Sequence, residues 1–250
     1  MIINFVFVFL LGTCIGSFLN VCILRIPKKQ TVIAGSSYCY ACGHKLNFLD
    51  MVPILSYLFL KGRCRYCGDK FSVQYPLVEL FSGIMFLLVF IKHGFGLPSL
   101  MLWVLVSILI IAAVIDIYHR IIPDGLVITG VLAGIPLTVI QSPDKLINGL
   151  IGFLIAGIIM LAIAVVSKGG MGGGDIKLSA LMGLYLGWRG VLLALFISFF
   201  FGGMTGIFLL LSGRKGRKDP VPFGPFLALG AVLTALWGNE LLVWYLGLCR

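Results

Sequence analysis

The chain has 250 residues, of which 60% are hydrophobic and only 11% are charged. An ordinary water-soluble domain carries about 25% charged residues, so this composition excludes a soluble globule, and it equally excludes a disordered or collagen-like chain. A membrane-spanning helix needs about 20 apolar residues, and the chain has room for many such helices. We therefore expect an all-α polytopic membrane protein.

Eight apolar runs follow one another along the chain, and one long polar insertion separates the first from the second. The runs cover residues 2–24, 76–91, 97–117, 125–140, 146–166, 176–187, 190–211 and 221–247. No basic residue precedes the first run, whereas Arg25, Lys28 and Lys29 follow it at once, which is the reverse of a cleaved signal peptide. The sequence predicts about eight transmembrane helices: a first helix at 1–24, a cytoplasmic insertion at 25–75 and a larger transmembrane domain at 76–250.

The net charge of +10 is explained by topology. If every run crosses the membrane, only four of the 19 Lys and Arg residues lie outside, namely Lys92, Lys145, Arg189 and Arg250. The excess of basic residues in the other loops places those loops on the cytoplasmic side. The sequence shows no basic stripe interleaved with aromatic residues, so we expect no nucleic-acid partner.

One apolar run is too short for a simple crossing. Residues 176–187 make about 18 Å of helix, whereas the hydrocarbon core is about 30 Å thick. We expect this helix to begin below the membrane surface, with the glycine-rich stretch before it lining a cavity, because irregular backbone is tolerated there only inside protein or beside water.

Two identical Cys-x-x-Cys-Gly motifs stand in the polar insertion, and their sulfur ligands would be Cys39, Cys42, Cys64 and Cys67. Their spacing is typical of a Cys₄ structural zinc site. An insertion of this size has little core, so a metal would stabilise it. The alternatives are redox dithiols or unlinked thiols, with His44 as a conceivable substitute ligand.

Two of the nine acidic residues are candidates for catalysis. Asp116 and Asp175 stand at the inner ends of the third and sixth runs, so the topology brings both to the same membrane face. Two adjacent carboxylates share a proton: one can activate water while the other polarises a carbonyl group. The alternative is that each acid forms a local ion pair, for example with Arg120 or Lys177.

Other residues near these acids have weaker signals. Gly172, Gly173 and Gly174, directly before Asp175, would let a substrate strand approach the backbone. Glu79, one turn into the second run, either complements the helix dipole or has a functional role facing the cytoplasm. Asp124 reads as a helix-start residue that supports the site.

The order of several motifs resembles the type IV prepilin peptidases, which are GxGD-type intramembrane aspartic proteases. The resemblance rests on the two cysteine pairs and on residues 16–21 (GSFLNV), 50–54 (DMVPI), 75–80 (YPLVEL), 116–124, 172–178 (GGGDIKL) and 221–226 (VPFGPF). It covers nearly the whole chain, and the small size and the insertion are most similar to the competence-type members.

The resemblance implies an aspartic endopeptidase that removes the leader of type IV prepilin or pseudopilin precursors at the cytoplasmic face of the bacterial inner membrane. Asp116 and Asp175 match the family's catalytic aspartates, and residues 172–174 with Lys177 match its substrate-binding loop. The resemblance also implies N-methylation of the new N-terminus with S-adenosylmethionine as methyl donor. Glu79 is the first candidate for that reaction, since the insertion has no glycine-rich methyl-donor motif.

Two other classes of protein remain as alternatives. A proton-coupled transporter would use the same aspartates as proton relays, although such acids usually lie near the membrane midplane within inverted repeats. A membrane scaffold with a zinc-stabilised interaction module would leave the aspartates and the glycine loop without a role.

Overall fold

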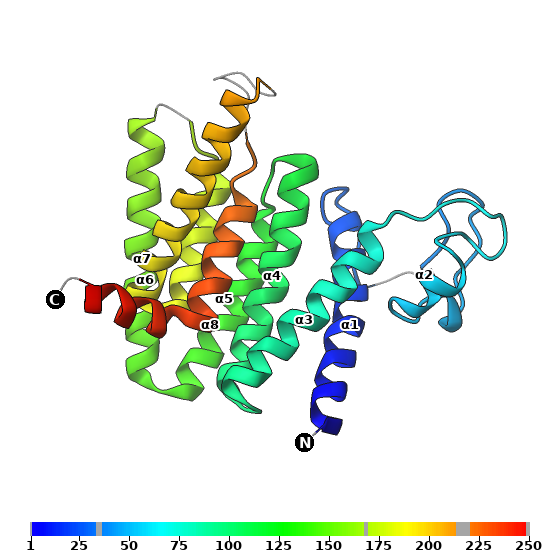
Figure 1. Ribbon diagram of the computed structural model, residues 1–250, viewed down its shortest axis with the longest axis horizontal. Coiled ribbons are helices and arrows are strands. Elements are labelled where there is room, and N and C mark those ends of the chain that lie inside the picture. Colours follow the sequence, from blue (N-terminus) through cyan, green and yellow to red (C-terminus); the bar gives the residue numbers. More distant parts are fainter. Residues whose placement is uncertain (1, 34–36, 168–169, 214–220, 249–250) are drawn as a thin grey trace. The chain divides into compact units, whose positions relative to one another are not determined.

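The computed structural model describes residues 2–33, 37–167, 170–213 and 221–248, without the side chains of 245, 246 and 248. The described residues form eight α-helices and one 3-10 helix, with no strand among them (Figure 1). The helices divide into two compact units, Met1–Gly94 and Phe95–Arg250. Some of the basic residues counted above, at 168, 214–218 and 250, lie outside the described residues.

Unit 1 holds the first apolar helix, the insertion and the second apolar helix. These are α1 (Ile2–Arg25), η1 (Phe48–Asp50), α2 (Leu55–Phe59) and α3 (Gln74–His93). The unit ends after α3, whereas the sequence analysis put the domain boundary before that helix.

Helices α1 and α3 pack closely because glycines face each other. A Cβ at Gly12 would be 2.8 Å from the Gly83 Cα, and a Cβ at Gly16 would be 2.7 Å from the Glu79 Cα. Small residues of this kind allow close approach of membrane helices, where no hydrophobic force drives them together. The packing therefore fixes Glu79 against the inner half of α1.

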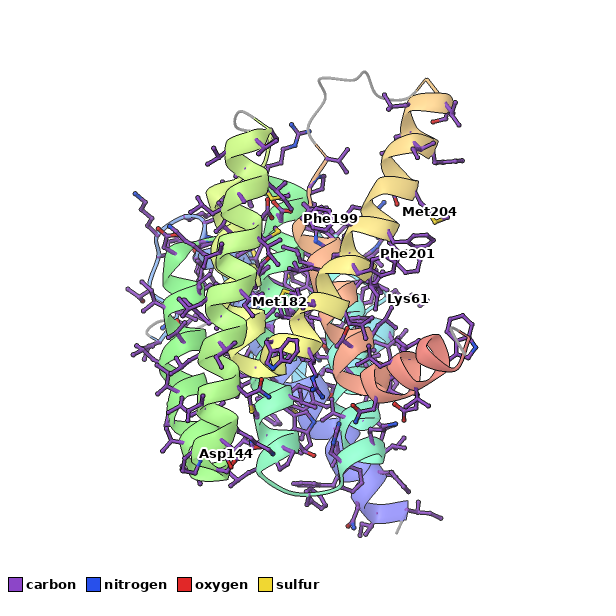
Figure 2. The ribbon with its side chains drawn as sticks, turned by 90° about the vertical axis from the view of Figure 1, so that its left-hand side faces the viewer. Lys61, Asp144, Met182, Phe199, Phe201 and Met204 are labelled. Carbon is purple, nitrogen blue, oxygen red and sulfur yellow. The ribbon has the colours of Figure 1, made fainter. Side chains whose placement is uncertain are left out.

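Unit 2 is a bundle of five long helices. They are α4 (Leu97–His119), α5 (Asp124–Gln141), α6 (Pro143–Val166), α7 (Gly173–Leu211) and α8 (Gly224–Leu248). The end of α4 and the starts of α5, α7 and α8 lie at one end of the bundle, whereas Asp144, at the start of α6, lies at the other (Figures 1 and 2). The loops that the sequence predicted to be cytoplasmic thus share one end of unit 2.

Helix α7 contains two of the eight apolar runs. Its backbone leaves helical geometry at Gly187 (φ 71°, ψ 174°), so residues 173–186 and 188–211 are two helical halves. The Trp188 N–H donates to the Asn148 Oδ1 of α6 at 3.3 Å, near the outer end of the bundle. The first half is only about 21 Å long and its start lies at the opposite end of the bundle, while the second half returns toward that end (Figure 1).

Seven helices in the described part of the chain are long and apolar enough to cross a membrane. Helix α7 is counted once among them, although it contains two of the eight apolar runs. Large apolar side chains remain exposed along them, as expected where lipid replaces water; Phe201 and Met204 on the second half of α7 are examples (Figure 2). The prediction of an all-α multi-pass membrane protein is confirmed.

Candidate active site

Asp116 lies in the last turn of α4, and its side chain is buried. The Gly224 N–H at the start of α8 donates a hydrogen bond of 2.8 Å to the Asp116 Oδ2. The segment before α8 is held in place because the Phe223 ring stacks on Phe199 of α7, with 5.1 Å between ring centroids. Three helices therefore determine where the Asp116 carboxylate lies.

Asp175 is the third residue of α7, and its N–H donates to the Gly172 carbonyl at 3.1 Å. Its carboxylate lies close enough to Asp116 for the two charges to interact. Gly174 packs on the loop between α4 and α5, where a Cβ would be 2.8 Å from the Ile122 Cβ. The structure thus brings together the two aspartates that the sequence placed 59 residues apart.

The structure shows one ion pair among the described residues of this region, and its partners differ from the pairs considered above. Lys177 forms an ion pair of 2.7 Å with Asp124, not with Asp175, and both side chains are exposed. Arg120 ends α4 in the left-handed conformation (φ 55°), and its N–H donates to the Asp116 carbonyl at 2.9 Å. The Lys177–Asp124 pair ties the start of α7 to the start of α5.

The arrangement can support hydrolysis. Two carboxylates that interact in a protein interior hold one proton between them more readily than two negative charges. The first turn of α7 also presents backbone N–H groups and the positive end of a helix dipole beside Asp175, as every helix start does. A carbonyl oxygen of a bound peptide would find donors there.

The four cysteines of the insertion gather into one cluster, as predicted. Their sulfur atoms all lie within 4.8 Å of one another, and the Cys39 and Cys67 sulfurs are 3.8 Å apart. A tetrahedral zinc site with Zn–S bonds of about 2.3 Å has sulfurs about 3.8 Å apart, so the donor set fits zinc. His44 instead stacks on the Tyr66 ring.

The two cysteine motifs adopt the same turn. The Gly43 N–H donates to the Cys39 carbonyl at 2.8 Å, and the Gly68 N–H donates to the Cys64 carbonyl at 3.0 Å. Both glycines have positive φ, 70° and 75°, which a side chain would disfavour. Backbone N–H groups of Cys67 and Tyr66 lower the pKa of the Cys64 thiol to about 7, which favours the thiolate that metals bind.

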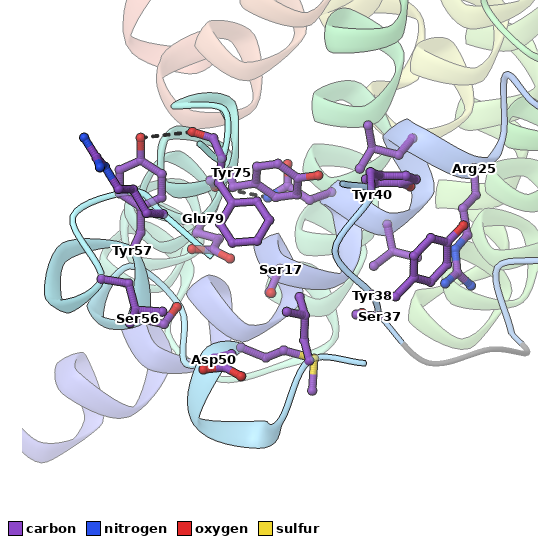
Figure 3. A pocket seen from close by; sticks show the side chains of 18 residues that line it. Ser17, Arg25, Ser37, Tyr38, Tyr40, Asp50, Ser56, Tyr57, Tyr75 and Glu79 are labelled. Atoms are coloured by element: carbon purple, nitrogen blue, oxygen red, sulfur yellow. Dashed lines mark hydrogen bonds between the residues drawn. The ribbon is translucent and has the colours of Figure 1, made fainter. Parts of the chain in front are cut away.

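A cavity of about 130 Å³ lies in unit 1, between the insertion and the inner halves of α1 and α3 (Figure 3). Its lining includes two carboxylates, Asp50 and Glu79, and four tyrosines, Tyr38, Tyr40, Tyr57 and Tyr75. All of its lining residues belong to unit 1, whereas the aspartate pair belongs to unit 2.

The two carboxylates of the cavity have defined partners. The Glu79 Oε2 accepts from the Ile54 N–H at 2.8 Å and the side chain also bonds to Ser17. Asp50 pairs with Arg65 at 2.6 Å. Burial alone would raise the pKa of Asp50, but hydrogen bonds from Arg65 and from the Asn47 N–H outweigh it and hold the pKa below its usual range.

Sequence reasoning did not select two residues that the structure places at these sites. Gly224 supplies a backbone donor to Asp116, and its signal was the Pro-Phe-Gly-Pro motif. Asn20 is buried at the cavity; its Nδ2 donates to the Tyr75 carbonyl at 3.0 Å, while its Oδ1 has no hydrogen-bond partner among the described residues. Its signal was the GSFLNV motif.

Two family profiles match the chain, in the order of its two units. Residues 10–93 match the Bacterial Peptidase A24 N-terminal domain, and residues 103–207 match the Type IV leader peptidase family. No solved structure matches.

Curated relatives match almost the whole chain. A Bacillus subtilis protein named prepilin leader peptidase/N-methyltransferase is 35% identical over 95% of this chain and 96% of its own length. Relatives with the same name from Myxococcus xanthus and Pseudomonas aeruginosa are 40% and 31% identical, each over 95% of this chain and over 76% and 91% of their own lengths. The chain therefore belongs to the type IV leader peptidase family, as its motifs had indicated.

Proposed function

We propose that this protein cleaves the leader from type IV prepilin-like precursors with Asp116 and Asp175 as its catalytic pair. The observation that carries the proposal is that Asp175, at the start of α7, lies within electrostatic range of Asp116, at the end of α4, where the Gly224 N–H orients the Asp116 carboxylate. The names of the relatives support leader cleavage as the reaction.

The mechanism follows from a shared proton. The ionised aspartate removes a proton from water, and the resulting hydroxide attacks the carbonyl carbon of the scissile peptide bond. The protonated aspartate donates its proton to the carbonyl oxygen, which gives a tetrahedral diol. The first aspartate then passes the proton taken from water to the nitrogen, and one hydroxyl returns its proton to the second aspartate as the C–N bond breaks and the amine of the mature N-terminus leaves.

The charge distribution supports cleavage at the cytoplasmic face of the inner membrane. Asp116 lies in the last turn of α4 and Asp175 in the first turn of α7, and by sequence the loops next to them are rich in basic residues, as loops that stay in the cytoplasm are. The substrate's hydrophobic helix would lie in the bilayer, with its scissile bond unwound beside residues 172–174. Lys177, tied to Asp124, would stand at the rim of that site.

We further propose that the cavity of unit 1 serves N-methylation, with S-adenosylmethionine as the methyl donor. Its residues fit that molecule: tyrosine rings attract a sulfonium cation and stack on an adenine ring, and the Asn20 Oδ1 is a buried acceptor without a partner among the described residues. The donor would supply an electrophilic methyl group. Glu79 would take up the proton that the acceptor amine loses.

The zinc ion that we propose for the Cys₄ cluster is structural. Four thiolates leave no open coordination position for water or substrate. The metal would hold together the two turns whose neighbours, Tyr38 and Tyr40, line the cavity. Loss of zinc should therefore affect methylation before it affects the aspartate pair.

Purified protein in lipid vesicles, incubated with a prepilin-like substrate, tests both activities by mass spectrometry. Loss of the leader reports cleavage, and gain of one methyl group in the presence of S-adenosylmethionine reports methylation. A substrate that begins at the mature N-terminus separates the two reactions, because it needs no cleavage. Failure to shorten any prepilin-like substrate would contradict the proposed cleavage.

A further inference from the structure

A short segment of the insertion lies beside the membrane helices of unit 1, closer to the membrane centre than the cytoplasmic ends of these helices. It comprises residues 51–60 and includes α2. The Ile54 N–H bonds to Glu79 of α3 at 2.8 Å, and Ser56, Tyr57 and Leu60 line the same cavity as Ser17 of α1 (Figure 3). The depth of Glu79 therefore gives the depth at which Ile54 meets α3.

That depth can be obtained from helix length. A hydrocarbon core of about 30 Å corresponds to about 20 helical residues. Counted from Ile2, the core ends near Cys22, so Ser17 lies about 7 Å inside its inner boundary. Counted back from His93, the core ends near Val73, so Glu79 lies about 9 Å inside. The contact with Glu79 thus places Ile54 level with lipid acyl chains, and Ser56, Tyr57 and Leu60 line the cavity that begins there.

The exposed side chains of the segment match this position, since they are apolar. Leu55, Leu58 and Phe59 are 51%, 63% and 82% exposed, and the adjoining Phe48 and Leu49 of η1 are 81% and 67% exposed. An exposed apolar surface of this kind on a module otherwise rich in polar residues marks an interaction site.

Basic residues begin where the segment ends. Lys61 and Arg63 follow α2 directly and are exposed, whereas the next basic residue, Arg65, pairs with Asp50. Long basic side chains at this place reach phosphate groups of anionic lipids while the neighbouring apolar side chains enter the acyl region. The charge pattern thus fits the inner leaflet.

The backbone of the segment also meets the requirement of a lipid environment. The N–H groups of Ser56, Leu58 and Leu60 donate to carbonyls within the segment at 3.0, 3.1 and 3.0 Å. Ile54 has a positive φ of 62°, which a β-branched residue rarely adopts, and its N–H is satisfied by Glu79. Backbone polar groups facing lipid must be paired in this way.

We propose that residues 51–60 form a membrane-embedded element whose apolar side chains, Leu55, Leu58 and Phe59, contact lipid acyl chains of the inner leaflet. The insertion is then partly immersed in the membrane rather than suspended in the cytoplasm. The proposal rests on the placement of this segment against α1 and α3 and does not depend on the reactions proposed above.

Tryptophan fluorescence in lipid nanodiscs tests the proposal with the full-length protein. Phe59→Trp and Leu58→Trp add one reporter each, Lys70→Trp is the exposed control elsewhere on the insertion, and the signal of the four native tryptophans is subtracted using the wild type. We expect lipids brominated on their acyl chains to remove more than half of the added emission at positions 58 and 59. Aqueous iodide should instead quench the emission added at position 70.

Each alternative outcome overturns the proposal. Iodide quenching at 58 and 59 equal to that at 70 would place the segment in water. Protection from both quenchers would mean that protein covers it. Zinc content and leader cleavage, measured on the same samples, show that the variants are folded.

Discussion

Replacing Gly224 by alanine should disable cleavage without touching either aspartate. A Cβ at this position would lie 2.9 Å from the Asp116 Oδ2, whereas ordinary contacts begin at 3.4 Å. The carboxylate must therefore retreat by about 0.5 Å, which lengthens its 2.8 Å hydrogen bond from the Gly224 N–H beyond the usual limit of about 3.2 Å.

The cost follows from the charge of the acceptor. A hydrogen bond to a charged group contributes about 1.5–3 kcal/mol, and each 1.4 kcal/mol of barrier is about tenfold in rate. We expect Gly224→Ala to cleave a prepilin substrate about 10- to 100-fold more slowly than the wild type. The assay is the initial rate of leader release in vesicles under subsaturating substrate.

The matched control is Gly203→Ala in the second half of α7, where an added Cβ meets nothing within 4 Å. This variant should cleave at the rate of the wild type. Methylation of a substrate that is already mature should be unchanged in Gly224→Ala, since every residue that lines the cavity belongs to unit 1. Wild-type cleavage by Gly224→Ala would refute the role assigned to its N–H.

Three further predictions concern the metal, the cavity and the helix packing. Cys42→Ser should lower the zinc content measured by mass spectrometry of metals, and wild-type protein without zinc near one ion per chain would rule out the Cys₄ site. Glu79→Gln keeps an acceptor for the Ile54 N–H but removes the charge, so methylation should fall while cleavage persists; equal methylation would exclude Glu79 as the base. Gly152→Ala would place a Cβ 2.7 Å from the Gly187 backbone, so the free energy of unfolding in detergent should fall by about 1–3 kcal/mol. Gly157→Ala, whose added Cβ would have its nearest contact at 3.6 Å, should be as stable as the wild type.

Much of the fold could be predicted because lipid imposes simple rules. The length of the apolar runs predicted the membrane helices. The basic residues of the loops predicted that Asp116 and Asp175 lie at the same membrane face. The run at 176–187 is short because the backbone leaves helical geometry at Gly187, which separates the two halves of α7. This break in the helix is held by the hydrogen bond from the Trp188 N–H to Asn148 of α6. Because this is a contact between two helices, no local sequence pattern predicts the position of the break.

The sites were predictable to different degrees. The cysteine cluster could be predicted because its ligands stand at fixed spacing within identical turns. The cavity of unit 1 could not, because it is formed by Asn20 from α1, Asp50 from η1 and Glu79 from α3, whose meeting depends on helix packing. Gly224 was overlooked for a related reason: its contribution is a backbone N–H, which no residue type announces.

Leader cleavage by Asp116→Asn and Asp175→Asn tests the central claim most directly. Each variant keeps the shape of the side chain but removes the carboxylate that must be ionised or protonated in turn. We predict that neither variant releases the leader, while both bind zinc and methylate a mature substrate as the wild type does. Substantial leader release by either variant would contradict the two-aspartate mechanism and leave that residue to another role, such as proton transfer.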